Sequence, residues 1–204
     1  MVRKVRIGVM VSGGGTNLQA LIDASKSGII ENGEISLVLS NKAGVYSLER
    51  GKNAGIPTAV VEKKNCTDQK DFEAKLIAEL ESHSIELIVL AGFMAILSKD
   101  FTDKYAKRII NVHPSLIPSF CGEGFYGLRV HRAALEKGVK VSGATVHFVN
   151  EIPDGGEIIM QKAVEVMEGD TPETLSARIL ENAEWKILPA STELVCKKIL
   201  SGEI

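Results

Sequence analysis

Short, nearly continuous apolar segments alternate with helical stretches through the first half of this chain, and this alternation limits its fold more than any other feature. The apolar segments lie at 5–11, 35–39, 58–61, 85–90 and 108–112, and helices are expected from near Leu18, at 46–53 and at 68–82. Apolar runs of about four to eight residues are typical of strands covered on both faces of a parallel sheet. We therefore expect an α/β, Rossmann-like fold with a mostly parallel sheet, flanking helices and ligands at the carboxyl ends of the strands.

The pattern changes after residue 113. A loop rich in proline, glycine and aromatic residues spans 114–127, a helix is expected at 130–137, and strands at 144–149 and 157–166 flank the turn 153–156. These two strands should form an antiparallel extension of the sheet. The last helix should begin at Pro172, and Pro189 should kink or divide it. With no repeat or linker, we expect residues 1–204 to be one domain whose halves, 1–110 and 111–204, share one body.

Charge and composition exclude several kinds of protein. The net charge of −2 argues against a nucleic-acid partner, and the longest apolar run, 87–97, is well short of the roughly 18 residues of a membrane helix. We expect a cytoplasmic protein without membrane contact, and the sequence leaves homo-oligomerisation open. Cys66, Cys121 and Cys196 are odd in number and form no CxxC pair, and the histidines have no ligand spacing, so we expect reduced thiols and no metal.

The candidate chemistry begins at Asn111 and His113, at the end of an apolar run. Their spacing of two on an extended segment puts an acid/base group and a neutral polariser on the same face. For the histidine alone, a structural role at a strand end is the competing interpretation. Asp154 could stabilise the imidazolium of His113 and raise its pKa. His147 alternates with apolar neighbours and is interpreted as structural.

A second candidate is the glycine loop Ser12-Gly13-Gly14-Gly15-Thr16-Asn17, between the first strand and the first helix. Free backbone N–H groups and the positive end of a helix can bind a phosphate here. Leu18 stands where a dinucleotide fingerprint has its third glycine, so a phosphomonoester fits better than NAD. A tight turn that needs glycine is the alternative. Residues 91–97 could be a pocket wall for a flat heteroaromatic ligand or simply core.

Taken together, these motifs resemble the phosphoribosylglycinamide formyltransferase family. The resemblance covers nearly the whole chain in order, through Ser12 to Leu18, Ser40-Asn41-Lys42-Ala43, Leu90 to Met94, Asn111 to Pro118 and Asp154-Gly155-Gly156. The Asn-x-His-Pro-Ser-Leu-x-Pro element is shared by the wider formyltransferase superfamily. The resemblance implies transfer of a formyl group from the co-substrate 10-formyltetrahydrofolate to the amine of glycinamide ribonucleotide, in purine synthesis, with no metal.

The resemblance also implies roles for individual residues. Asn111 and His113 would stabilise the formyl oxygen, with His113 as proton donor and Asp154 as its partner. Residues 1–110 would then be the phosphate-binding half, and 111–204 the catalytic and folate-binding half. Glycinamide ribonucleotide would contact Gly15, Thr16, Asn17, Gly92 and Glu184. The folate would contact Met94, Ala95, Ile96, Leu97, Asn111, Glu151, Ile152 and Pro153.

Two departures from the family pattern concern the edges of the site. Position 95 is alanine where other members can have arginine, and Gln69-Lys70 stands where a basic residue can reach the folate tail. The loop 120–127 is longer than in some relatives. Alternatives are a formyltetrahydrofolate deformylase or a non-catalytic nucleotide-binding module. We do not expect a methionyl-tRNA formyltransferase, since 204 residues at net −2 leave no room for an RNA-binding domain and a basic surface.

Overall fold

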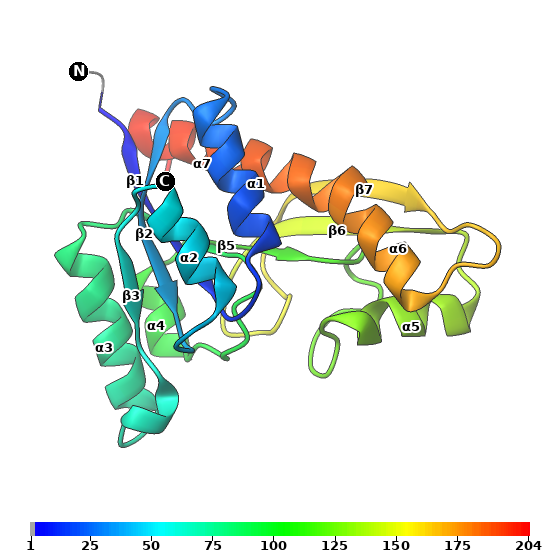
Figure 1. Ribbon diagram of the computed structural model, residues 1–204, viewed down its shortest axis with the longest axis horizontal. Coiled ribbons are helices and arrows are strands. Elements are labelled where there is room, and N and C mark those ends of the chain that lie inside the picture. Colours follow the sequence, from blue (N-terminus) through cyan, green and yellow to red (C-terminus); the bar gives the residue numbers. More distant parts are fainter. Residues whose placement is uncertain (1–2) are drawn as a thin grey trace.

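A computed structural model describes residues 3–204 and contains one seven-stranded sheet (Figure 1). The strand order is β3-β2-β1-β4-β5-β6-β7. Strands β1 to β5 run parallel to one another, whereas β6 pairs antiparallel with both β5 and β7. The strands are β1 (Val5–Val11), β2 (Gly33–Ser40), β3 (Thr58–Val60), β4 (Leu87–Leu90), β5 (Ile109–His113), β6 (Val141–Phe148) and β7 (Ile158–Glu165). The expected α/β fold with an antiparallel extension is confirmed.

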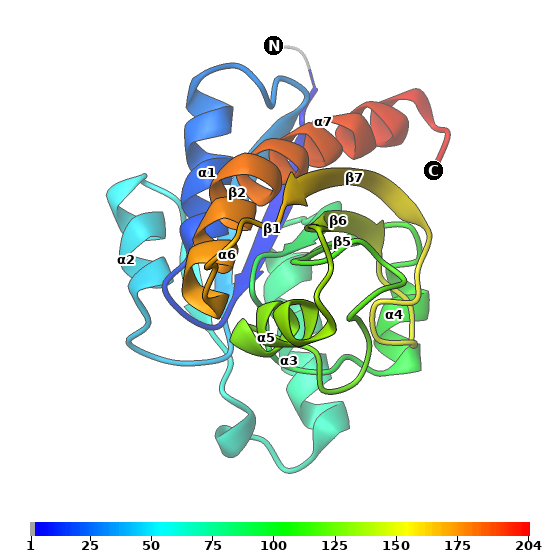
Figure 2. The same ribbon diagram turned by 90° about the vertical axis from the view of Figure 1, so that its right-hand side faces the viewer.

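The helices form layers on both faces of the sheet. They are α1 (Thr16–Lys26), α2 (Tyr46–Asn53), α3 (Gln69–Ser82), α4 (Lys99–Lys104), α5 (Leu128–Lys137), α6 (Pro172–Ile179) and α7 (Trp185–Ser201), with a short 3₁₀ turn at Lys63–Asn65. One core cluster joins the sheet to α1, α2, α6 and α7, and a second joins it to α3 and α4. Figures 1 and 2 show α1 and α2 on one side of the parallel strands, and α3 and α4 on the other. Because both faces are covered, the parallel strands are as apolar as the sequence indicated.

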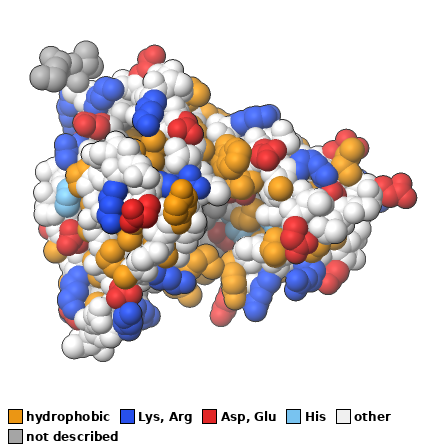
Figure 3. Space-filling view, in the orientation of Figure 1, with side chains coloured by type: hydrophobic (Ala, Val, Ile, Leu, Met, Phe, Trp, Pro, Cys, Tyr) orange, Lys and Arg blue, Asp and Glu red, His pale blue; other side chains and the backbone are white. Residues whose placement is uncertain are grey.

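The site is set by the order of the strands. Strand β1 lies between β2 and β4 in the sheet. The helices that follow β1 and β4, α1 and α4, therefore cover opposite faces of the sheet. A ligand crevice is expected outside the carboxyl ends at such a switch point. In Figure 1 the β6–β7 pair reaches beyond the parallel strands with α5 and α6 beside it, and Figure 3 shows a hollow where the two parts meet.

The last helix differs from the expectation. It is interrupted by a π-helical turn at Leu180–Glu184, whereas Pro189 lies inside the continuous helix α7, so the predicted division at Pro189 is wrong. Pro189 is the fifth residue of α7 and removes only the bond to the carbonyl of Trp185, the first residue of that helix. The π turn instead places Glu184 in the interior, where it is 8% exposed.

Two further observations complete the fold. The short helix α4 was not expected from the sequence, and it is stabilised at its start by Ser98, whose side chain accepts a hydrogen bond from the Phe101 N–H. Ser98 is in turn bonded to the buried carboxylate of Glu73 on α3. Within residues 3–204, no helix has the length and apolar character needed to cross a membrane.

Candidate active site

The carboxyl ends of three strands are joined by the hydroxyl of Ser12, directly after β1. Its Oγ donates to Asn41 Oδ1, after β2, at 2.7 Å, and accepts from the Met94 N–H, after β4, at 2.8 Å. The loop of residues 12–15 therefore has a fixed position relative to the crevice.

The turn into α1 contains three glycines, which differ in how far the backbone requires them. Gly15 is the N-cap of α1 and has φ 73°, a conformation that favours glycine, and a Cβ at Gly15 would lie 2.6 Å from Ser47 Cβ. A Cβ at Gly13 or Gly14 would meet nothing within 4 Å. Only Gly15 is thus required by the backbone, and the loop has open space above Gly13 and Gly14.

Helix α2 supports this loop from behind. The Ser47 N–H donates to the Gly13 carbonyl at 3.1 Å, and Arg50 Nε donates to the Gly14 carbonyl at 2.9 Å. Arg50 also bonds Gln19 on α1 and lies over the ring of Tyr46. These contacts turn loop carbonyls toward α2 and place a positive charge beside a segment suited to an anion.

The start of α1 meets the π turn through Asn17 and Glu184. Asn17 Nδ2 donates to Glu184 Oε2 at 2.6 Å, whereas Asn17 Oδ1 is buried without a hydrogen-bond partner among residues 3–204. Burial raises the pKa of Glu184, and the bond from Asn17 opposes that rise. Gly92, after β4, has φ 76° and open space around its Cα. The five residues expected to contact the ribonucleotide lie at the N-cap and first turn of α1, on the π turn and in the loop after β4.

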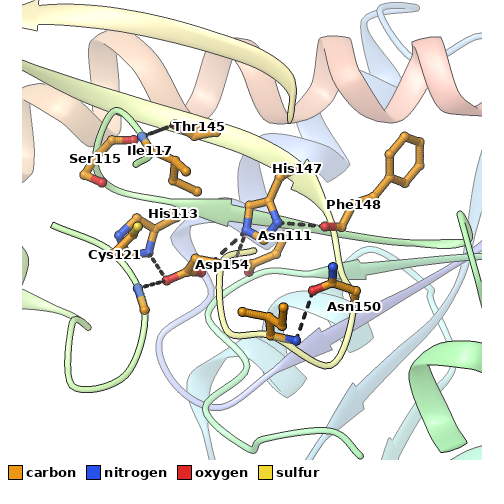
Figure 4. A network of polar contacts seen from close by, with 12 residues as sticks. Asn111, His113, Ser115, Ile117, Cys121, Thr145, His147, Phe148, Asn150 and Asp154 are labelled. Atoms are coloured by element: carbon orange, nitrogen blue, oxygen red, sulfur yellow. Dashed lines mark hydrogen bonds and ion pairs between the residues drawn. The ribbon is translucent and has the colours of Figure 1, made fainter. Parts of the chain in front are cut away.

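On the other side of the switch point, β5 carries Asn111 and His113. His113 is 4% exposed, and its Nε2 lies 2.9 Å from the Phe120 carbonyl oxygen. Its Nδ1 lies 3.3 Å from Asp154 Oδ2 (Figure 4). Both contacting oxygens are hydrogen-bond acceptors, so only the doubly protonated imidazole can donate to both of them. The structure thus brings His113 and Asp154 together from segments 41 residues apart in sequence (154 − 113).

Burial and the Asp154 carboxylate have opposite effects on the pKa of His113. Burial lowers the pKa of His113, and the carboxylate of Asp154 and the Phe120 carbonyl only partly oppose this, so the net direction is downward. The expected effect of Asp154, which raises the pKa of His113, is therefore present, but burial of the ring outweighs it. The ring is neutral at rest near pH 7, and it gains a proton readily only when further negative charge develops beside it.

Asp154 lies in the loop after β6 and adopts φ 56°, which aspartate tolerates better than most residues. Its Oδ2 also accepts from the Gly122 N–H at 2.9 Å. Burial tends to raise the pKa of Asp154, but the imidazoles of His147 and His113 and the Gly122 N–H outweigh it, so the pKa lies below its usual value. Asp154 is therefore ionised at neutral pH.

His147 was interpreted as structural, but the structure places it in this centre. Its Nε2 lies 3.3 Å from Asn111 Nδ2 and 3.5 Å from Asp154 Oδ1, and Asn111 and His147 are direct partners in the β5–β6 pairing. The antiparallel register could have revealed this contact. The sequence predicts the two strands but not their register, so the signal was missed.

The loop after β5 is tied to β6 and partly covers the histidine. Thr145 Oγ1 donates to the Ser115 carbonyl at 2.7 Å and accepts from the Ile117 N–H at 3.0 Å. These bonds lead the chain back over β5, where Phe120 places its carbonyl on His113. A substrate oxygen that reaches His113 Nε2 must replace this carbonyl.

Apart from Asn111 on β5, the residues expected to contact folate form two exposed segments and one buried position. Met94, Ile96 and Ile152 are 52%, 74% and 59% exposed, which is unusual for large apolar side chains. Leu97 is 7% exposed and packs in the core with α3 and α4, so it can offer little surface to a ligand. Gln69 donates to the Ile96 carbonyl and thereby holds that segment. The remaining positions, Ala95, Glu151 and Pro153, are at least partly exposed.

Residues 3–204 contain no group of three or more His, Cys, Asp and Glu side chains that could hold a metal ion.

Comparisons with known proteins agree on one family. The profile described as "Formyl transferase" matches residues 5–192. The phosphoribosylglycinamide formyltransferase of Haemophilus influenzae is 42% identical over 199 residues, which cover 98% of this chain and 89% of that protein. A crystal structure of glycinamide ribonucleotide transformylase 1 from Symbiobacterium toebii has a TM-score of 0.89 and 41% identity, covering 95% of this chain and 88% of the other.

Longer relatives contain a similar segment. The trifunctional purine biosynthetic protein adenosine-3 of Gallus gallus is 49% identical over 192 residues, or 94% of this chain. The chain spans only 18% of the length of that relative.

Proposed function

This chain belongs to the formyl transferase family, and we propose that it transfers the formyl group of 10-formyltetrahydrofolate to the amine of phosphoribosylglycinamide, in purine synthesis. The observation that carries the proposal is the grouping of Asn111, His113 and Asp154 around the end of β5, across the switch point from the open glycine loop at residues 12–15. The 42% identity to a phosphoribosylglycinamide formyltransferase over 98% of the chain supports the choice of substrate.

The proposed reaction starts when the neutral amine attacks the formyl carbon. A bond from the amine nitrogen to carbon forms, negative charge develops on the formyl oxygen, and the bond from carbon to the folate N10 then breaks. The amine loses one proton and N10 gains one, so no net proton is consumed. Asn111 Nδ2 and a His113 N–H stabilise the oxygen, as hydrogen-bond donors do in other acyl transfers.

The histidine changes its proton affinity during this reaction. The resting ring has a pKa lowered by burial, whereas an oxyanion beside it favours the imidazolium. His113 can therefore take up the proton released by the amine, through water, and deliver it to the leaving nitrogen. Asp154 stabilises the transient charge from the opposite nitrogen of the ring at 3.3 Å.

The two substrates would lie on opposite sides of this centre. We place the phosphate of the ribonucleotide on the N–H groups of Gly15, Thr16 and Asn17, with its ribose near Glu184 and its glycyl amine near Gly92. The folate ring would lie between the exposed segments at 94–96 and 151–153, with Leu97 supporting it from the core. Small-molecule substrates are thus the expected partners.

Mixing the protein with both substrates and following tetrahydrofolate release tests this proposal. Transfer to the ribonucleotide amine, with a formylated product detected by mass spectrometry, is the expected result. Release of formate from the folate at the same rate without the ribonucleotide would indicate a deformylase instead. Binding of the ribonucleotide with no turnover of the folate would indicate a non-catalytic nucleotide-binding module.

A further inference from the structure

We propose that His147 is a positioning residue that fixes the amide of Asn111, so that Asn111 presents an N–H group, and not its oxygen, to the formyl group. This inference depends on the proposed formyl transfer for its consequence in catalysis. The contact itself is a property of the folded chain and can be tested separately.

The backbone holds the two side chains opposite each other. Asn111 on β5 and His147 on β6 are direct partners in an antiparallel pair, and the neighbouring pairs Ile110–Phe148 and Val112–Val146 continue the register on both sides. Directly opposed side chains in such a pair are close enough to interact. His147 is 2% exposed, so its ring has little freedom to turn away.

The hydrogen bonds of His147 determine which ring nitrogen carries the proton. Nδ1 lies 2.8 Å from the carbonyl oxygen of Phe148, which can only accept. Nδ1 must therefore be protonated. In the neutral ring Nε2 then has no proton and acts as an acceptor.

This tautomer decides the orientation of Asn111. The amide group of Asn111 faces His147 Nε2 at 3.3 Å, and only its nitrogen can donate to that acceptor. The second N–H of Asn111 remains free for a substrate oxygen. If the amide turned over, its oxygen would take the place of Nδ2 and face His147 Nε2. The site would then lose the Asn111 N–H that donates to the formyl oxygen and would have a second acceptor in its place.

The carboxylate of Asp154 is the competing partner for His147. Its Oδ1 lies 3.5 Å from Nε2, and a protonated Nε2 would donate to it and release Asn111. Asp154 already receives the Gly122 N–H at 2.9 Å and faces His113 at 3.3 Å. Asp154 therefore has two partners besides His147, whereas Asn111 has no other hydrogen-bond acceptor for its amide group among residues 3–204.

Two matched substitutions separate positioning from packing. The carboxamide of His147→Gln reaches the place of Nε2 and can accept from Asn111, whereas that of His147→Asn reaches only the place of Nδ1. We expect kcat to fall roughly 10- to 100-fold in His147→Asn, with KM for both substrates within about threefold, since a donor displaced by an ångström or so costs this much. His147→Gln should recover about tenfold of that loss. Equal losses in kcat in the two variants, at equal melting temperature, would overturn the proposal.

A double-mutant comparison gives a second criterion. In an Asn111→Ala background, His147→Asn should reduce kcat by no more than about twofold further, because the group that it positions is absent. A full additional loss would mean that His147 acts independently of Asn111, which contradicts the proposal.

A nitrogen-15 spectrum of the histidine rings tests the contact without any substrate. We expect the neutral ring of His147 to carry its proton on Nδ1 and none on Nε2. A proton on Nε2 would overturn the proposal whether or not the protein transfers formyl groups. If the spectrum is as expected but the wild-type protein transfers no formyl group, it is the proposed function that fails.

Discussion

The proposed phosphate-binding loop and the proposed catalytic centre lie at the same edge of the sheet but are built in different ways. The loop is a contiguous segment, residues 12–17, that would bind a phosphate with its backbone N–H donors and the start of α1. The proposed catalytic centre takes its side chains from β5, β6 and the loop after β6, and brings two buried histidines to a partly buried carboxylate. The first depends on the path of the backbone and the second on protonation states.

This difference predicts how each region responds to change. A backbone site should tolerate loss of any single side chain but respond to added volume, since a Cβ blocks N–H groups. A site of buried titratable groups should respond to the loss of a single charge and to pH. Substitutions in the two regions should therefore separate binding from turnover.

The largest effect is expected from His113→Ala. Turnover should fall roughly 10²- to 10⁴-fold, the usual range for an acid/base group, while KM changes little. Steady-state kinetics with both substrates measures this, and His83→Ala, at the end of α3, is the matched control, expected to change kcat by less than about twofold. Turnover close to that of the control would remove His113 from the mechanism and leave the centre without an acid/base group.

A smaller loss, about 10- to 100-fold in kcat, is expected from Asp154→Asn. The negative charge of Asp154 favours the imidazolium form of His113, so its removal should lower the pKa of His113 further. If neutral His113 is the active resting form, the acid limb of the pH–rate profile reports that pKa and should move to lower pH. An acid limb at the wild-type pH would contradict the pairing of the two groups. Asp103→Asn, at an exposed position of α4, should leave the profile unchanged.

The loop is tested by Gly14→Ala, which adds a methyl group in open space. We expect KM for the ribonucleotide to rise about tenfold, equivalent to ~1.4 kcal/mol of binding, with KM for the folate and kcat nearly unchanged. Gly15→Ala is the informative contrast, because its methyl group would overlap Ser47 and its φ is unfavourable for alanine. The Gly15→Ala variant should lose thermal stability. A Gly14→Ala protein with the wild-type KM for the ribonucleotide would mean that the phosphate does not bind above this loop.

The smallest effect on catalysis is expected from His131→Leu on α5, which should change only the pH dependence of stability. Burial, together with the nearby His113, lowers the pKa of His131 to about 4, and its Nδ1 has no hydrogen-bond partner among residues 3–204. A histidine with a lowered pKa in the folded state adds stability above its unfolded pKa, near pH 6.5, and this is lost as pH falls toward 4. For a shift of this size the loss is about 2–3 kcal/mol.

Chemical unfolding at several pH values measures this effect. The free energy of unfolding of the wild type should fall between about pH 6.5 and 4, and that of His131→Leu should fall less, because only His113 and the remaining groups still respond. His83→Leu should follow the wild type. Parallel curves for wild type and His131→Leu would show that His131 is not held neutral by the fold.

Much of the fold could be predicted because it is encoded locally. The parallel sheet was predicted from the apolar runs that become β1, β2, β4 and β5, and its antiparallel extension from the turn after β6. The predicted ends of these strands lie within a few residues of the observed ones. Helix α4 was missed because six residues are too few to show a periodic pattern. The break in the last helix was assigned to Pro189 because proline is visible in a sequence, whereas the π turn that turns Glu184 inward has no local signature.

The sequence by itself determined the strands, the glycine turn at residues 12–15 and the pair Asn111 and His113 on one face of a strand, because period and backbone preference act over a few residues. Only the tertiary structure decided that His147 lies opposite Asn111, that Asn17 meets Glu184 and that burial outweighs Asp154 in setting the pKa of His113. Register and desolvation depend on which distant segments pack together, and that information is spread over the whole chain.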